Sequence, residues 1–224
     1  MIEAVIFDMD GIMFDTEQLM LRALEQTARE FGYDGAEEIK KEIMGTNARV
    51  TREIFMRHYG PDFPYDRFMA FRQKLIDREI SEKGVPLKPG LFELLRYLRE
   101  NGYGTAVATS TSREHALEYI RSTGAEPYFQ KIICGDMLEK SKPDPEIYCT
   151  AAAALDLAPQ VCMALEDSPN GVRSAHAAGM AAVMVPDLIP PTPELDRLLF
   201  ARVETLADVI GLLEEQKLRK SGEA

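Results

Sequence analysis

The stretch "AVIFDMDG", residues 4–11, gives the first indication of both fold and chemistry. Residues 4–7 are apolar and have the composition of a short buried strand. Asp8 and Asp10 follow one residue apart, with Gly11 behind them. Aspartate and glycine both favour turns, so the segment by itself is consistent with a simple turn. Two like charges at the end of a buried strand are also what a cation site requires, and the rest of the chain distinguishes the two interpretations.

Four further apolar runs are typical of buried strands, at residues 105–109, 131–134, 161–165 and 181–185. From the first of these onward, helical patterns such as "SREHALEYIRSTG" and "PEIYCTAAAALDL" separate them. Strands that are apolar on both faces and alternate with helices predict an α/β fold, with a doubly wound parallel sheet of Rossmann-like type. In such sheets the ligand crevice lies outside the carboxyl ends of the strands. Asp8 and Asp10 therefore follow a strand where chemistry is expected.

The segment between the first two strands is too long for one crossover helix. Residues 15–86 contain four helical patterns that each end in glycine, "EQLMLRALEQTAREFG", "AEEIKKEIMG", "ARVTREIFMRHYG" and "YDRFMAFRQKLIDREISEKG". We expect an inserted helical cap domain at 16–86 and a catalytic core formed by 1–15 and 87–224. The last eight residues, 217–224, are expected to form a frayed tail.

The composition limits the classes of partner and compartment. The chain has 224 residues, 46% of them hydrophobic, and a formal net charge of −11. This charge argues against nucleic acid or an anionic membrane surface as partners, and an anionic substrate would need local cations. Cys134, Cys149 and Cys162 lie in apolar stretches without Cys-x-x-Cys spacing, which indicates a reducing, cytoplasmic compartment and no zinc site. With no leader pattern and no run of ~18 apolar residues, we expect neither secretion nor a membrane span.

Polar residues of different types follow four of the predicted strands: Asp8 and Asp10; Thr109, Ser110 and Thr111; Lys142; and Glu166 and Asp167. Taken singly, such residues are typical of helix caps, turns and solvated surface. Because the carboxyl ends of parallel strands meet at one edge, we expect them to converge. Carboxylates from two strand ends fit Mg²⁺, whose charge offsets their repulsion. Lys142 and Thr109 supply the positive charge and hydroxyl donor that phosphoryl oxygens require.

Four segments, in this order, resemble the motifs of the haloacid dehalogenase superfamily: "FDMDG" with Asp8 and Asp10, "VATS" with Thr109, "KSKPDPEIY" with Lys142, and "LEDSPNG" with Glu166 and Asp167. Within the superfamily, the chain is similar to the phosphatase and β-phosphoglucomutase-like group, which carries a helical cap after the first strand. The resemblance covers nearly the whole chain. Any one motif is common, whereas four in order with the cap in place are specific.

The resemblance implies a mechanism with two carboxylates in different roles. Asp8 would attack phosphorus to give an aspartyl-phosphate, and Asp10 would protonate the leaving oxygen and then take a proton from water. Lys142 would neutralise charge on the phosphoryl oxygens. Thr109 and the backbone N–H of Ser110 would complete the phosphate cradle. The chain would then be a phosphomonoester hydrolase built for turnover.

The resemblance also assigns a metal site. Mg²⁺ would bind Asp8, the backbone carbonyl of Asp10, and Asp167. Glu166 would be a further ligand or would hold the ligands in place. Because Mg²⁺ usually keeps several waters and takes one or two carboxylates, this set is sufficient.

A phosphatase and a mutase require the same core, and the cap distinguishes them. β-Phosphoglucomutases usually carry a histidine in the first cap helix, whereas here that helix has none and Met20 stands near the expected place. His58, His115 and His176 lie elsewhere and are interpreted as ordinary helix or surface residues. We therefore expect a phosphatase that hydrolyses a small phosphorylated metabolite, such as a sugar phosphate. A β-phosphoglucomutase-type mutase is the alternative.

The cap offers candidates for recognising the rest of the substrate. Asn47, Arg49 and Lys74 are the residues that we expect to contact it, although cations on helices are commonly just solvated. The expected partner is a small-molecule phosphate ester, and the expected assembly is a monomer or weak homodimer.

Two functions from other classes remain as alternatives. A phospho-acceptor receiver domain also groups aspartates, a hydroxyl residue and a lysine at the edge of a parallel sheet. Such a signalling module would have no large cap, and its phosphorylated aspartate would not follow the first strand. A catalytically silent phosphate-binding protein would be expected to lack one of the motif residues, and all of them are present here.

Overall fold

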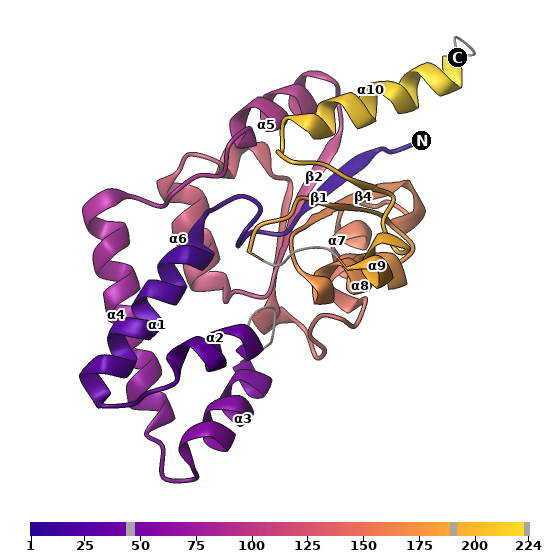
Figure 1. Ribbon diagram of the computed structural model, residues 1–224. Helices are drawn as coiled ribbons and strands as arrows, with labels where there is room; N and C mark the ends of the chain where they lie inside the picture. Colours follow the sequence, from indigo (N-terminus) through magenta and orange to yellow (C-terminus); the bar gives the residue numbers. More distant parts are fainter. Residues whose placement is uncertain (44–47, 189–191, 222–224) are drawn as a thin grey trace. The chain divides into compact units, whose positions relative to one another are not determined.

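The chain folds into two compact units. The computed structural model describes residues 1–43, 48–188 and 192–221 (Figure 1). One unit comprises residues 1–14 and 87–224, and the other comprises residues 15–86. The boundary falls one residue earlier than the sequence analysis puts it, because residue 15 belongs to the helical unit.

The first unit is built on a parallel sheet of six strands. The strand order is β3-β2-β1-β4-β5-β6, and each neighbouring pair is parallel. The predicted doubly wound α/β fold is thus confirmed. The strands are β1 (Ala4–Phe7), β2 (Gly104–Thr109), β3 (Lys131–Cys134), β4 (Cys162–Glu166), β5 (Ala181–Met184) and β6 (Ala201–Arg202). β1 lies between β2 and β4 (Figure 1). The strands β2 and β3 therefore extend the sheet on one side of β1, and β4, β5 and β6 extend it on the other.

Helices cover both faces of this sheet, as continuous apolar strands require. Alternate strand residues such as Ala4, Ile6 and Ala164 share one buried cluster with residues of α7 (Glu146–Ala154) and α8 (Pro169–Ala177). The intervening residues are buried as well: Phe7 is fully buried and its ring packs edge-on against Phe129, at 5.5 Å between centroids.

The remaining elements of this unit complete its layers. They are α5 (Leu91–Glu100), α6 (Arg113–Ser122), α9 (Pro193–Asp196), α10 (Asp208–Ser221) and the short 3₁₀ turns η1 (Glu126–Tyr128), η2 (Gly135–Met137) and η3 (Pro159–Val161). α5 packs against β2 and against α10. The expected frayed tail is wrong in part, because α10 continues to Ser221. No helix within residues 1–43, 48–188 and 192–221 is both long and apolar enough to cross a bilayer.

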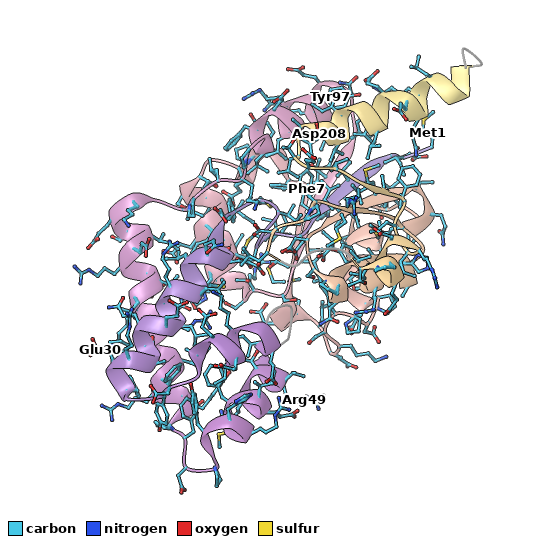
Figure 2. The ribbon with its side chains drawn as sticks, viewed as in Figure 1. Met1, Phe7, Glu30, Arg49, Tyr97 and Asp208 are labelled. Carbon is cyan, nitrogen blue, oxygen red and sulfur yellow. The ribbon has the colours of Figure 1, made fainter. Side chains whose placement is uncertain are left out.

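The second unit consists of helices, as the insertion predicts. They are α1 (Thr16–Phe31), α2 (Ala36–Ile43), α3 (Ala48–Tyr59) and α4 (Tyr65–Lys83). Their apolar faces meet in an aromatic cluster in which Phe55, Phe63 and Phe68 are buried and their rings contact one another. Glu30 and Arg49 are exposed residues of this unit (Figure 2). The unit therefore has an apolar core of its own.

Candidate active site

Three strands of the core end beside one another at the carboxyl edge of the sheet. Phe7, at the end of β1, pairs with Val107 of β2 and with Leu165 of β4. The Asp8 backbone N–H continues the ladder by donating to the Leu165 carbonyl at 3.0 Å. Because Glu166 is the last residue of β4, its carboxylate lies at the same edge as that of Asp8. The convergence expected from the sequence is thus present for these strand ends.

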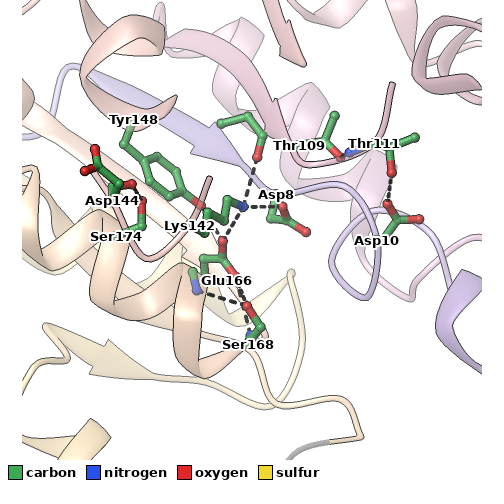
Figure 3. A network of polar contacts seen from close by, with 12 residues as sticks. Asp8, Asp10, Thr109, Thr111, Lys142, Asp144, Tyr148, Glu166, Ser168 and Ser174 are labelled. Carbon is green, nitrogen blue, oxygen red and sulfur yellow. Dashed lines mark hydrogen bonds and ion pairs between the residues drawn. The ribbon is translucent and has the colours of Figure 1, made fainter. Parts of the chain in front are cut away.

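Lys142 joins two of these ends through a buried ion-pair network. Its Nζ donates to Asp8 Oδ1 at 2.5 Å, to Glu166 Oε1 at 2.6 Å and to the Ala108 carbonyl at 3.1 Å. An ammonium has three protons, so every donor is used. Burial by itself would lower the pKa of Lys142, but the charges of Asp8 and Glu166 outweigh it and raise that pKa. Figure 3 shows the ammonium between the two carboxylates.

The carboxylate of Glu166 accepts several hydrogen bonds. Besides Lys142, its Oε1 accepts a hydrogen bond from the Tyr148 hydroxyl at 2.6 Å. Its Oε2 accepts from the Ser168 hydroxyl at 3.1 Å and from the Ser168 N–H at 3.4 Å. The side chain is fully buried. These four donors fix the orientation of the group.

Tyr148 is a residue of the candidate site that was not assigned from the sequence. It lies on α7 and is fully buried, and Lys142 Nζ stands 5.1 Å from the centre of its ring. Burial, and then the neighbouring charge of Glu166, raise the pKa of Tyr148 well above its ordinary value, so its hydroxyl stays a donor. Its place in "KSKPDPEIY", six residues after Lys142, was the only signal in the sequence.

Two glycines allow the carboxylates to approach the backbone. A Cβ on Gly171 of α8 would stand 1.8 Å from the carboxyl carbon of Glu166. A Cβ on Gly11 would stand 2.2 Å from Asp167 Oδ2, and Gly11 also has a φ of +81°, which strains any other residue. Both positions therefore require glycine because a functional carboxylate occupies the space of the side chain.

The carboxylates suit a metal ion by position and by charge. Within the described residues, oxygens of Asp8, Glu166 and Asp167 lie within 4.8 Å of one another, and all three residues are buried. Burial raises the pKa of Asp8 to about 8, the charge of Glu166 adds to the rise, and Lys142 opposes it. One lysine thus leaves the cluster with excess negative charge. An all-oxygen donor set of this kind fits a hard divalent cation.

Asp10 lies apart from this cluster. Within the described part of the chain, its carboxylate is not one of the converging group, and its Oδ2 instead accepts a hydrogen bond from the Thr111 hydroxyl at 2.6 Å. The Thr111 N–H donates to Thr109 Oγ1 at 3.1 Å. Thr109 is buried, whereas Ser110 is exposed. The expected binding of metal by the Asp10 carbonyl stays a prediction.

Of the three residues of the helical unit that were expected to contact the substrate, two are exposed. Arg49 on α3 is 83% exposed and reaches Glu53 only at 4.0 Å, and Lys74 on α4 is exposed. Asn47 lies outside the described residues. Met20, near the place where a mutase histidine is expected, packs in an apolar cluster with Leu19.

The histidines and cysteines have other partners and surroundings. His58 contacts Glu42 at 2.8 Å, His115 contacts Ser112, and His176 contacts the Leu198 carbonyl. The three cysteines are free, and burial raises the pKa of both Cys134 and Cys162 to about 11, so those two are neutral thiols at physiological pH. None of these residues is needed to build the carboxylate and lysine site.

Known proteins are similar to this chain along most of its length. The haloacid dehalogenase-like hydrolase family matches residues 5–185. A phosphorylated carbohydrates phosphatase of Thermotoga maritima is 34% identical over 181 residues, which cover 81% of this chain and 83% of that protein. The β-phosphoglucomutase of Bacillus subtilis is 30% identical over 190 residues, which cover 82% of this chain and 83% of that protein.

A solved structure is similar to nearly the whole chain. It is that of a variant of CbbY from Rhodobacter sphaeroides in complex with xylulose-(1,5)bisphosphate, with a TM-score of 0.79 and 29% identity. The aligned region covers 93% of this chain and 96% of the CbbY chain. The match of the family to residues 5–185 spans β1 through β5 and includes each strand end of the site. The chain therefore belongs to the haloacid dehalogenase-like hydrolase family, and it is a hydrolase.

Proposed function

We propose that the protein is a Mg²⁺-dependent phosphatase that acts on a small phosphorylated metabolite through an aspartyl-phosphate. The observation that carries this proposal is the buried cluster of Asp8, Glu166 and Asp167, in which Lys142 pairs with Asp8 and Glu166. A phosphate ester is an anion, and such a cluster accepts it only with a cation present. Bound Mg²⁺ would supply charge neutralisation and a fixed orientation for the phosphoryl oxygens.

The proposed reaction has two steps. In the first, an oxygen of Asp8 forms a bond to phosphorus, the ester P–O bond breaks, and the leaving oxygen takes a proton from Asp10. In the second, a water oxygen attacks phosphorus, its proton goes to Asp10, and the bond between Asp8 and phosphorus breaks to release phosphate. Each proton that Asp10 gives is thus returned within one turnover.

Lys142 and the β2 end have supporting roles in this proposal. The Lys142 ammonium holds Asp8 in place and neutralises charge beside the transferring group. Its bond to Glu166 keeps the lysine in one rotamer, because all three of its protons are engaged. Thr109 and the N–H of Ser110 would donate to the phosphoryl oxygens.

A phosphorylated carbohydrate is the substrate class that we favour. The names of the relatives support it: the Thermotoga protein is named as a phosphatase of phosphorylated carbohydrates, and the CbbY variant was solved with a sugar bisphosphate. We propose that the helical unit at residues 15–86 serves as the cap, and that Asn47, Arg49 and Lys74 recognise the part of the substrate that does not react. The exposed ammonium and guanidinium groups of two of them are suited to an anionic or hydroxylated ligand.

A β-phosphoglucomutase is the second candidate, because one relative carries that name at 30% identity. A mutase has to retain a bisphosphate and return a phosphoryl group to it. The position near which mutases carry a histidine is occupied here by Met20, which lies in an apolar cluster and has no proton to exchange. This difference favours hydrolysis.

The function is tested by phosphate release from a panel of phosphorylated sugars and other metabolites. We expect release from at least one sugar phosphate, silenced by EDTA and restored by Mg²⁺, with Ca²⁺ a poor substitute because its coordination is looser and higher. Asp8→Asn is the matched control, since it keeps the shape and removes the attacking charge. Activity that survives both EDTA and this substitution would exclude the proposed chemistry.

Phosphorus NMR separates the phosphatase from the mutase. The protein is incubated with β-glucose 1-phosphate and a trace of the 1,6-bisphosphate. Free phosphate as the main product supports hydrolysis. Glucose 6-phosphate that accumulates well ahead of phosphate would assign the mutase reaction instead, with the same core residues.

A further inference from the structure

The side chain of Thr111 contacts the carboxylate of Asp10. Thr111 follows the end of β2, and its hydroxyl donates to Asp10 Oδ2 at 2.6 Å, across 101 residues of chain. A hydroxyl bonded to a carboxylate is a charge-assisted donor, which is stronger than a neutral pair. Figure 3 shows this pair beside the network of Asp8 and Lys142 and separate from it.

The backbone around Thr111 is fixed, so its hydroxyl is presented from one position. Its N–H donates to Thr109 Oγ1 at 3.1 Å, and its carbonyl accepts from the Gly135 N–H at 3.3 Å. A Cβ on Gly135 would stand 2.5 Å from the Ser110 carbonyl oxygen, so this loop packs directly on the backbone of η2. Contacts from β2 and from the end of β3 thus hold the donor in place.

We propose that Thr111 is a positioning residue for Asp10, and that it acts on proton transfer to the leaving group rather than on binding of the phosphoryl group. With Oδ2 engaged by Thr111, the proton that Asp10 transfers is carried by Oδ1, and the plane of the carboxyl group is set. This inference rests on the proposed function, because it assigns a role within that reaction. It concerns the acid that protonates the ester oxygen, and leaves the attack by Asp8 unchanged.

The effect of losing the Thr111 hydroxyl on kcat/KM should depend on the leaving group of the ester. An ester with a good leaving group, such as p-nitrophenyl phosphate, needs little protonation, whereas phenyl phosphate needs more. Loss of the Thr111 hydroxyl should therefore lower kcat/KM for phenyl phosphate by about ten- to a hundredfold and for p-nitrophenyl phosphate by about threefold or less. The inhibition constant of inorganic phosphate should stay within about twofold of the wild type, because phosphoryl binding is untouched.

The experiment compares Thr111→Val, which keeps the shape and removes the hydroxyl, with Thr111→Ser, which keeps the hydroxyl. The serine variant should restore most of the loss. Thr105→Val is the matched control, because Thr105 lies on β2, the strand that Thr111 follows, and its hydroxyl donates to the Tyr128 carbonyl, away from the site. Thr111→Ala carries the same comparison if the valine variant is unstable, as judged by its melting temperature.

Two results would overturn the inference. An equal loss for both esters would mean that Thr111 has only a structural role, and a raised inhibition constant for phosphate would make it a substrate contact. Failure of the inference is distinguishable from failure of the function. If Asp8→Asn abolishes activity while Thr111→Val affects both esters alike, only the role of Thr111 is wrong.

Discussion

At the scale of single residues, the site requires glycine where a larger side chain would overlap one of its carboxylates. Gly171 lies in α8 at a position where a Cβ would overlap the Glu166 carboxyl group, at 1.8 Å. Glu166 cannot move away without breaking its bonds to Lys142 and Tyr148. A single methyl group at residue 171 should therefore disturb Lys142 without contacting it.

We predict that Gly171→Ala lowers stability by about 1–3 kcal/mol through overpacking, and that it lowers kcat by at least about tenfold because Lys142 is displaced. Gly211→Ala is the matched control. Gly211 is also helical, in α10, and a Cβ there meets nothing within 4 Å. That variant should keep full activity and gain about 0.5–1 kcal/mol, since alanine favours helix. Thermal melts and steady-state kinetics measure both, and an active, stable Gly171→Ala would contradict the geometry.

The residues of the candidate site could be predicted from the sequence only where their types and order form a motif. Asp8, Lys142 and Glu166 were expected at one edge of the sheet, and the structure brings them into contact. Tyr148 was not expected in this role, because its function depends on which way α7 presents it to the interior. That direction follows from packing between elements, which a local pattern does not contain.

At the scale of elements, the start of α8 connects helix stability with catalysis. Ser168 is its N-cap: the side-chain oxygen accepts from the Gly171 N–H at 3.1 Å, and the same hydroxyl donates to Glu166 Oε2. One side chain therefore satisfies an otherwise unpaired N–H of the first turn and orients a carboxylate of the site.

We predict that Ser168→Ala lowers stability by about 1 kcal/mol, as the loss of an N-cap does elsewhere, and that it also lowers kcat. Thr192→Ala is the control, because Thr192 caps α9 in the same way, through the Leu195 N–H at 3.3 Å, and contacts no residue of the site. The two variants should have similar melting temperatures and different activities. Equal activities would show that the hydrogen bond from Ser168 to Glu166 does not contribute to kcat.

Some helices and strands could be predicted from the sequence and others could not. The five buried strands were expected within one residue at each end, since their apolar runs are continuous. β6 (Ala201–Arg202) was not expected, because two residues cannot form a periodic pattern. The end of α10 was expected to fray, yet the helix reaches Ser221, and its Lys217 bonds to Tyr97 and Asn101 of the α5 region. These tertiary contacts outweigh a local composition that is typical of a tail.

At the scale of the whole molecule, charge couples metal binding to pH. The chain has a net charge of −11, and burial raises the pKa of Asp8 to about 8 from an ordinary value of 3.8. Between these pH values Asp8 is ionised in the unfolded chain, whereas in the folded metal-free protein burial favours a proton on Asp8 more than the Lys142 contact opposes it. The stability that this proton contributes is complete below about pH 3.8 and is lost progressively as the pH rises from there to about 8.

We predict that Mg²⁺ binding follows the opposite trend, because the cation has to displace that proton. The affinity for Mg²⁺ should increase by about tenfold per pH unit between pH 6 and 8 and level off above. Melting temperatures with and without Mg²⁺ at several pH values measure it, and the rise on adding Mg²⁺ should be larger at pH 8 than at pH 6. Asp8→Asn should remove this pH dependence. A Mg²⁺ effect that is constant with pH would mean that Asp8 is already ionised in the metal-free protein.

The central claim is that Asp8 becomes covalently phosphorylated, and acid-quenched mass spectrometry of the protein during turnover tests it most directly. Asp10→Asn is expected to slow breakdown of the intermediate more than its formation from p-nitrophenyl phosphate, so this variant is the one to quench. The account predicts the mass of one added phosphoryl group on the peptide that contains Asp8, which increases with the burst of p-nitrophenol and is absent from Asp8→Asn. A burst without this adduct, or an adduct on a different residue, would contradict it.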